Sequence, residues 1–398
     1  MHDPDDTPSR HQPVFLSLGF RPFFTAAAVF SVLSMLTWMQ VYVFGRGWLP
    51  GGLPAVVWHA HEMVYGYAMA VIAGFLLTAV HNWTGVQTLQ GLPLLLLLLL
   101  WAAARLLVFA GDGVPLALGA LADTLFAAIL LIAIARPVIK VRQWRQMGIL
   151  SKLILLMCGN LLFYAGALEI LPHGVREGLY SGLYLIVALI LVMARRVLPM
   201  FIEKGVARPV RLINRRWPDA AGLLLFLVFW IADILQPDSR LVATLAGLLF
   251  ILHALRMAGW YTPGIWRRPL LWVLYGGYGF LVLGFALKAA VPLVAVSPLL
   301  ALHAFAYGGI GLFTLGMMTR VTLAHTGRNI QEPPPVLFWM FAVLMLGALI
   351  RVLLPLADPG HYALWIGLSQ ALWIAAFAAF LFTCLPMLLK PRIDGQGG

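Results

Sequence analysis

Long apolar segments separated by short polar turns follow one another along almost the whole of this sequence. The chain has 398 residues, of which 62% are hydrophobic and 11% are charged. Soluble domains average about 45–50% apolar and about 25% charged residues. A water-soluble fold would need a charged surface that this chain cannot supply. The sequence therefore predicts an all-α, polytopic membrane protein.

Twelve of the apolar segments are long enough to span a bilayer, which takes about 20 residues of helix. The predicted spans are residues 20–44, 56–80, 92–110, 114–135, 149–171, 179–200, 219–235, 240–259, 270–291, 297–319, 335–354 and 361–389. We expect one transmembrane domain over residues 1–398, with a short N-terminal segment at 1–19 and a tail at 390–398. The acidic start of the chain differs from the basic start of a signal peptide, so we expect the first span to be retained.

The positions of Lys and Arg predict the orientation of the spans. With both termini in the cytoplasm, 21 of the 27 basic residues lie on the cytoplasmic side, as the positive-inside rule requires. The net charge of +12 then reflects membrane topology, and we expect lipid and not nucleic acid as the partner of this surface. Cys158 and Cys384 stand alone in separate apolar segments and indicate no disulfide framework.

The second and tenth spans share a pattern at a constant offset of 242 residues. The matching pairs are His61 and His303, Tyr65 and Tyr307, Gly66 and Gly308, Gly74 and Gly316, Thr84 and Thr326, and Gly85 and Gly327. Both spans run in the same direction, which predicts a parallel internal repeat. The alternative is a chance match in a chain that uses few residue types.

Histidines inside membrane spans are functional candidates, because ionisable groups are costly there. Each residue of a helix turns by about 100°, so His59 and His61 point about 200° apart. His59 shares a face with Glu62, and His61 shares a face with Tyr65. One helix could therefore serve two sites at the same depth.

Neutral imidazole is a ligand for haem iron, copper and other transition metals. Our hypothesis makes His61 and His303 the axial ligands of one haem b between the second and tenth spans. His59 would bind a second haem or a metal such as copper, and Glu62 would handle protons or bind metal beside it. His253 is a further candidate metal ligand. The alternatives are interhelical hydrogen bonds for His61 and His303, a proton path or a hydrogen-bonded pair for His59 with Glu62, and simple burial for His253.

Several other residues are candidates for contact with a cofactor. Tyr65, Tyr307 and Gly308 lie close to the two repeated histidines in sequence, and the glycine could admit a flat macrocycle or only allow close helix packing. Arg320 and His325 could pair with acidic groups of a haem, or could simply follow the inside-positive topology. Asp123 lies in mid-span and must be either neutral or paired, and the sequence does not identify a partner.

At these residues the chain resembles the NnrS family of bacterial inner-membrane proteins. The matching segments are residues 19–24, 58–63, 74–79, 82–85, 195–199, 301–303, 318–320 and 325–328. The resemblance implies a haem- and copper-containing protein of nitric oxide metabolism, denitrification and nitrosative stress in the bacterial inner membrane. Many members have His where this chain has Tyr275, which would alter a site that used that residue.

The sequence and the resemblance together give three functional hypotheses. The first is a haem protein that binds or reduces nitric oxide, as a nitric oxide reductase-type oxidoreductase would, with quinol or a cytochrome as electron donor. The second is a sensor or sequestering protein that binds nitric oxide or metal without turnover. The third is a proton-coupled transporter. Whether the protein is an enzyme stays open at this point.

Overall fold

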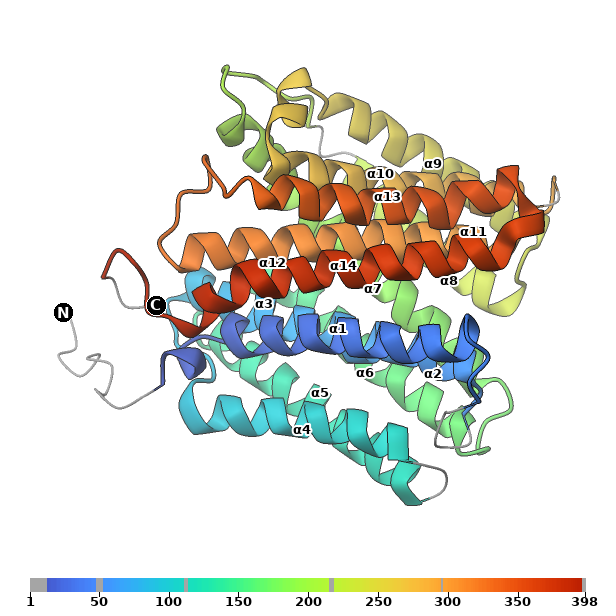
Figure 1. The fold of residues 1–398 in the computed structure, drawn as a ribbon, viewed down its shortest axis with the longest axis horizontal. Helices are drawn as coiled ribbons and strands as arrows, with labels where there is room; N and C mark the ends of the chain where they lie inside the picture. Colours follow the sequence, from blue (N-terminus) through green and yellow to red (C-terminus); the bar gives the residue numbers. More distant parts are fainter. Residues whose placement is uncertain (1–12, 48–52, 111–113, 215–217, 295, 396–398) are drawn as a thin grey trace.

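The computed structural model describes residues 13–47, 53–110, 114–214, 218–294 and 296–395, and these residues form a bundle of roughly parallel and antiparallel helices (Figure 1). The first half of the bundle contains α1 (Phe20–Tyr42), α2 (Ala55–His61) continuing through η2 (Glu62–Ala68) into α3 (Met69–Thr84), α4 (Gly91–Ala110), α5 (Val114–Lys140), α6 (Met147–Ala167) and α7 (Gly174–Gly205). The second half contains α8 (Pro218–Leu235), α9 (Arg240–Gly259), α10 (Pro269–Ala290), α11 (Pro298–His303) continuing through η5 (Ala304–Gly311) into α12 (Leu312–His325), α13 (Val336–Ala357) and α14 (Tyr362–Leu389). Short 3-10 turns are η1 (Val14–Leu16), η3 (Trp144–Gln146), η4 (Pro263–Arg267) and η6 (Pro359–His361).

The predicted number of spans agrees with this arrangement. In the described part of the chain, eleven helical segments are long and apolar enough to cross a membrane. The remaining long helix is α8, which has 18 residues and therefore also reaches the length of a short span. The all-α, multi-pass prediction is confirmed, and the helix ends lie within a few residues of the predicted ones.

The start of α1 and the end of α14 meet at the same end of the bundle (Figure 1). The buried guanidinium of Arg21 donates from Nη1 to the carbonyl oxygens of Leu388 and Lys390, at 2.9 and 2.8 Å. An even number of crossings returns the chain to the side on which it started. Both ends therefore lie on one side, as the predicted topology requires, and the cytoplasmic identity of that side stays a prediction.

The two repeated spans have the same backbone irregularity at equivalent positions. In both, a regular α-helix ends at the repeated histidine, and a π-helical segment follows at once: η2 after His61 and η5 after His303. Both spans later end at a glycine with positive φ, Gly85 at 66° and Gly327 at 76°. The two helices also run in the same direction (Figure 1). Shared backbone geometry at the 242-residue offset supports the parallel repeat.

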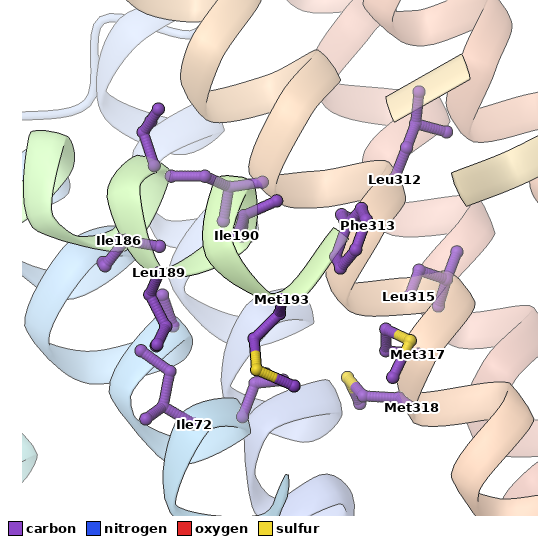
Figure 2. Packing of buried hydrophobic residues seen from close by; sticks show 14 of the residues in the cluster. Ile72, Ile186, Leu189, Ile190, Met193, Leu312, Phe313, Leu315, Met317 and Met318 are labelled. Atoms are coloured by element: carbon purple, nitrogen blue, oxygen red, sulfur yellow. The ribbon is translucent and has the colours of Figure 1, made fainter. Parts of the chain in front are cut away.

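The centre of the bundle is packed with large apolar side chains from α3, α7 and α12. Figure 2 shows Ile72, Met193, Leu315 and Met318 meeting in this layer. Side chains on the outer faces are also apolar, and Leu33 and Leu106 are more than half exposed, as expected for residues that face lipid. Along α12, the packed layer begins where η5 ends, so it lies beyond the repeated histidines, toward the end of the bundle where α12 ends.

Candidate functional site

An apolar cavity of about 260 Å³ lies between the repeated helices, beside the start of α2 and α11. Both His59 and His303 line it, and we call it the histidine cavity. The rest of its lining includes Met35 from α1, Met63 from η2, Tyr180 and Leu183 from α7, Tyr307 from η5 and Trp373 from α14. Two imidazoles in an otherwise apolar chamber are the kind of polar pair that orients a ligand.

His59 is held by its ring and has an unsatisfied nitrogen. The ring stacks on Trp38, with 4.8 Å between the ring centroids and 6° between the planes. Its Nδ1 is buried and has no hydrogen-bond partner among the described residues. A buried polar atom without a partner costs about 1–3 kcal/mol. A ligand or a metal at this nitrogen would remove that cost.

His303 has partners for both ring nitrogens. Its Nδ1 lies 2.7 Å from the backbone oxygen of Leu299, one turn earlier in the helix. A carbonyl can only accept, so this contact places the proton on Nδ1 and leaves a lone pair on Nε2. Nη2 of Arg351, from α13, lies 3.0 Å from that Nε2. A ligand that used Nε2 would have to replace the guanidinium.

A second polar group, which we call the buried ionic cluster, consists of His61, Glu62, Arg105, Asp123 and Asn160. Nη1 of Arg105 lies 2.9 and 3.0 Å from the two carboxylate oxygens of Glu62. Nη2 of the same guanidinium forms an ion pair with Asp123. The side chains of these three residues are at most 4% exposed. Arg105, which is on α4, therefore joins η2 and α5 inside the bundle.

His61 belongs to this cluster and not to the histidine cavity. Its Nδ1 lies 2.9 Å from Oε1 of Glu62, and its Nε2 lies 3.0 Å from Oδ1 of Asn160. The ring also stacks on Phe163, at 4.1 Å between centroids. The expected opposite directions of His59 and His61 agree with this arrangement. The structure, however, brings His59 and not His61 to the cavity that His303 lines.

Glu62 also differs from its expected place beside His59. The π-helical segment begins at this residue, and the buried guanidinium of Arg105 draws its carboxylate toward α4. The partner that Asp123 requires is the same Arg105, supported by a hydrogen bond of 2.8 Å from the Tyr164 hydroxyl.

The charges of the ionic cluster do not balance without a proton. It contains two carboxylates and one guanidinium, so a neutral His61 leaves one net negative charge away from water. Burying uncompensated charge is strongly unfavourable. One proton, carried on His61 or shared with a carboxylate, makes the group neutral. The cluster is therefore suited to hold one proton.

Arg351 and Arg105 have corresponding places in the two repeats. Each lies on the helix that follows the repeated histidine, and each reaches back to the histidine-bearing helix: Arg105 to Glu62, and Arg351 to His303. The sequence could have marked Arg105 and Arg351 as candidates, because each is a lone arginine in an apolar span. Such an arginine is rare unless it has a buried partner. Asn160 carried no comparable signal.

The predicted tyrosines and glycine mainly position helices. The hydroxyls of Tyr65 and Tyr307 donate to backbone oxygens of Gly178 on α7 and Ser369 on α14, at 2.6 and 2.7 Å. Tyr307 also lines the histidine cavity. Gly308 does not line it. A Cβ at Gly308 would lie 2.2 Å from the ring of Phe280, so this glycine admits an aromatic ring from α10.

Arg320 and His325 lie at the other end of the same span, away from the histidine cavity. A helix rises 1.5 Å per residue, so they are roughly 25 and 33 Å along the axis from His303. The guanidinium of Arg320 lies over the ring of Phe201, and His325 is 3.3 Å from the amide nitrogen of Asn82. The length of the span separates both residues from any group held at His303.

His253 is also separate from the other histidines. It lies on α9, is 3% exposed, and contacts the Tyr278 hydroxyl through Nδ1 at 2.6 Å. In the described part of the chain, no three His, Cys, Asp or Glu side chains come together as a metal site would require. Any metal bound by these histidines would need ligands from elsewhere, as a porphyrin supplies.

The family model described as NnrS protein matches residues 14–392, nearly the whole chain. The chain belongs to the NnrS family. A search of curated proteins finds no match to this chain. Membership makes it a membrane protein tied to nitric oxide metabolism. The NnrS match includes both repeated spans, the histidine cavity and the buried ionic cluster.

Proposed function

We propose that this NnrS-family protein holds haem b in the histidine cavity, between His59 and His303, and uses it to bind or reduce nitric oxide. The observation that carries the proposal is the pair of imidazoles, from two repeat-related helices, that line one apolar cavity. The unpartnered Nδ1 of His59 supports it. On this proposal His61 is a member of the ionic cluster and not an axial ligand.

The residues of the cavity fit a haem in their chemistry. Imidazole is a common axial ligand, and apolar walls suit the macrocycle. The volume of about 260 Å³ is just below the range of about 300–1,000 Å³ that is usual for ligand sites. Seating a macrocycle would require the walls to widen. Met35 and Met63 line the cavity, and methionine side chains adapt readily.

The bound haem would supply an iron that coordinates nitric oxide and exchanges electrons. The protein's own part is to hold the iron, to exclude water and to supply protons. Nitric oxide is small and uncharged, so it could reach the apolar cavity from the lipid. Reduction of nitric oxide to nitrous oxide consumes protons and electrons. The buried ionic cluster is the proposed proton store, with Glu62 as its proton-handling carboxylate and a quinol or a cytochrome as electron donor.

The setting of the proposal is the bacterial inner membrane, where such electron donors are found. Copper is a further metal that the family resemblance implies. With no cluster of three protein ligands in the described residues, our proposal assigns it no site.

A proton-coupled transporter is the second candidate, and one observation favours it. Buried pairs of carboxylate and guanidinium, such as Glu62 and Arg105, are typical of proton relays in transporters. Both residues also line a groove of about 670 Å³ between α1 and α4. A transporter of this kind needs no haem, so the optical spectrum separates the two proposals.

The test is the spectrum of the purified full-length protein and of matched variants. We expect a Soret band in the wild type, and lower haem content or a changed spin state in His59→Ala and His303→Ala. His361→Ala is the control, because that side chain is 70% exposed, pairs with Asp358 and does not line the histidine cavity. Consumption of nitric oxide with a reductant separates turnover from binding. A wild-type protein prepared with haem available that shows no Soret band would rule out the haem proposal.

A further inference from the structure

A second cavity lies toward the cytoplasmic end of the bundle, between α7, α8 and α9. Its volume is about 190 Å³. Three arginines and one carboxylate line it, namely Arg195 and Arg196 from α7, Arg256 from α9 and Asp219 from α8. The walls therefore carry a net charge of +2. Such an excess of positive charge in a partly enclosed space attracts anions.

The single carboxylate pairs with two of the three arginines. Oδ1 of Asp219 accepts from Nε of Arg195 at 2.9 Å and from Nη2 of Arg256 at 2.8 Å. These contacts hold the two guanidiniums in place beside the cavity. Arg196 is fixed separately, since its Nη1 donates to Oε1 of Gln146 at 2.9 Å. One carboxylate shared by two guanidiniums positions them and leaves an excess of positive charge in the lining.

His253 supplies an unsatisfied nitrogen at the same cavity. The residue is only 3% exposed, and it lines the cavity. Its Nδ1 faces Tyr278, which is not part of the wall, and its Nε2 has no hydrogen-bond partner in the described part of the chain. The edge of the ring that is left for a ligand is therefore the one with Nε2.

The contact with Tyr278 allows a donor on the free edge of the His253 ring. A phenolic hydroxyl can donate to Nδ1 of His253, 2.6 Å away. When it does so, a neutral His253 carries its hydrogen on Nε2. The unpartnered atom is then a donor, as an anion site needs.

We propose that this cavity binds a phosphate group, through Arg196, Arg256 and Nε2–H of His253. Guanidinium groups and N–H donors are the usual ligands of phosphate oxygens in proteins. The first turn of α8 lies at the cavity through Asp219 and Gly222, and a helix N-terminus adds positive potential there. The phosphate could belong to an anionic phospholipid of the cytoplasmic leaflet or to a free phosphate ion. The proposal is independent of haem and of nitric oxide.

The lining of the cavity gives a way to separate the two sources. Leu223, which is 43% exposed, joins the polar wall to the lipid-facing surface of α8. An acyl chain could follow that surface while the head group occupied the cavity. A free phosphate ion would gain nothing from it.

The test uses purified full-length protein in detergent, with two probes. Phosphatidylglycerol is titrated and followed by native mass spectrometry, and inorganic phosphate is titrated and followed by the melting temperature. Charge-assisted hydrogen bonds contribute enough that Arg196→Gln, Arg256→Gln and His253→Phe should each weaken binding by about tenfold. His253→Phe keeps a ring to stack on Phe285, which lies 5.6 Å away. If loss of the Asp219 contact prevents Arg256→Gln from folding, the other two variants decide the result.

Arg267→Gln is the matched control, because it removes one exposed cytoplasmic arginine that does not line the cavity. Binding of phosphatidylglycerol that falls in the cavity variants but not in this control supports the lipid source. The same pattern with inorganic phosphate alone supports the free ion. The proposal is overturned if the cavity variants bind each probe as tightly as the Arg267→Gln control does. It is also overturned if the wild type binds neither probe.

Discussion

Arg105 and Glu62 form a salt bridge inside the membrane-spanning bundle, with Nη1 and Oε1 2.9 Å apart and side chains only 4% and 1% exposed. The residues lie on α4 and η2, 43 positions apart in sequence. The same guanidinium pairs with Asp123 on α5. One arginine thus pairs with carboxylates from two neighbouring helices, in the same buried cluster that holds His61.

Replacing Arg105 should strongly destabilise the protein. Arg105→Leu leaves two buried carboxylates without a cation, and breaking a buried ion pair costs about 3–5 kcal/mol. Thermal unfolding in detergent measures the loss. The triple variant Arg105→Leu, Glu62→Gln, Asp123→Asn removes the charge imbalance and should recover most of the stability. Equal instability in the single and triple variants would show that packing, and not charge, is the role of Arg105.

His61 and His59 should have different effects on haem when each is replaced. His59→Ala removes a proposed axial ligand, so haem content should fall several-fold. His61→Ala removes one hydrogen-bond partner from each of Glu62 and Asn160, which costs about 1–3 kcal/mol of stability, but it should retain haem. The ratio of Soret absorbance to protein measures the difference. Loss of haem in His61→Ala alone would return the ligand role to that residue.

Arg351 should influence the reduction potential of a haem bound at His303. A nearby positive charge disfavours the ferric state, which carries one more positive charge than the ferrous state. Arg351→Gln should therefore lower the midpoint potential, on the order of the 59 mV that corresponds to a tenfold change in a one-electron equilibrium. Redox titration of the Soret band measures it. Arg240→Gln is an exposed control on the same side of the bundle, and a shift of the same size there would contradict a local effect.

Gly308 should be intolerant of a side chain for reasons of packing. A Cβ at this position would lie 2.2 Å from Cγ of Phe280, and overpacking costs about 1–3 kcal/mol. Gly308→Ala should lower the melting temperature while leaving the Soret maximum unchanged. At Gly148 on α6 an added Cβ meets nothing within 4 Å, so Gly148→Ala is the neutral control. A changed Soret maximum in Gly308→Ala would indicate contact with the macrocycle.

The α-helical bundle could be predicted from residue type and spacing. Apolar segments of about 20 residues have few stable structures in lipid besides helices, because their backbone groups must pair internally. The repeat was also visible, since His61 and His303 carry matching neighbours. The π-helical segments that follow both histidines were not, because this change of backbone hydrogen bonding depends on the packing around each helix.

Which residues belong to the site was partly predictable from the sequence. Which of them contact one another was not. The sequence marked His59, His61, Glu62 and His303 as costly groups in apolar surroundings, and helix geometry placed His59 and His61 on opposite sides. Which of the two histidines lies beside His303 depends on how the helix is rotated in the bundle. That rotation follows from contacts among residues far apart in sequence, above all the pairing of Glu62 with Arg105. Local periodicity fixes the relative directions of side chains on one helix, but only the packed tertiary structure decides what each of them meets.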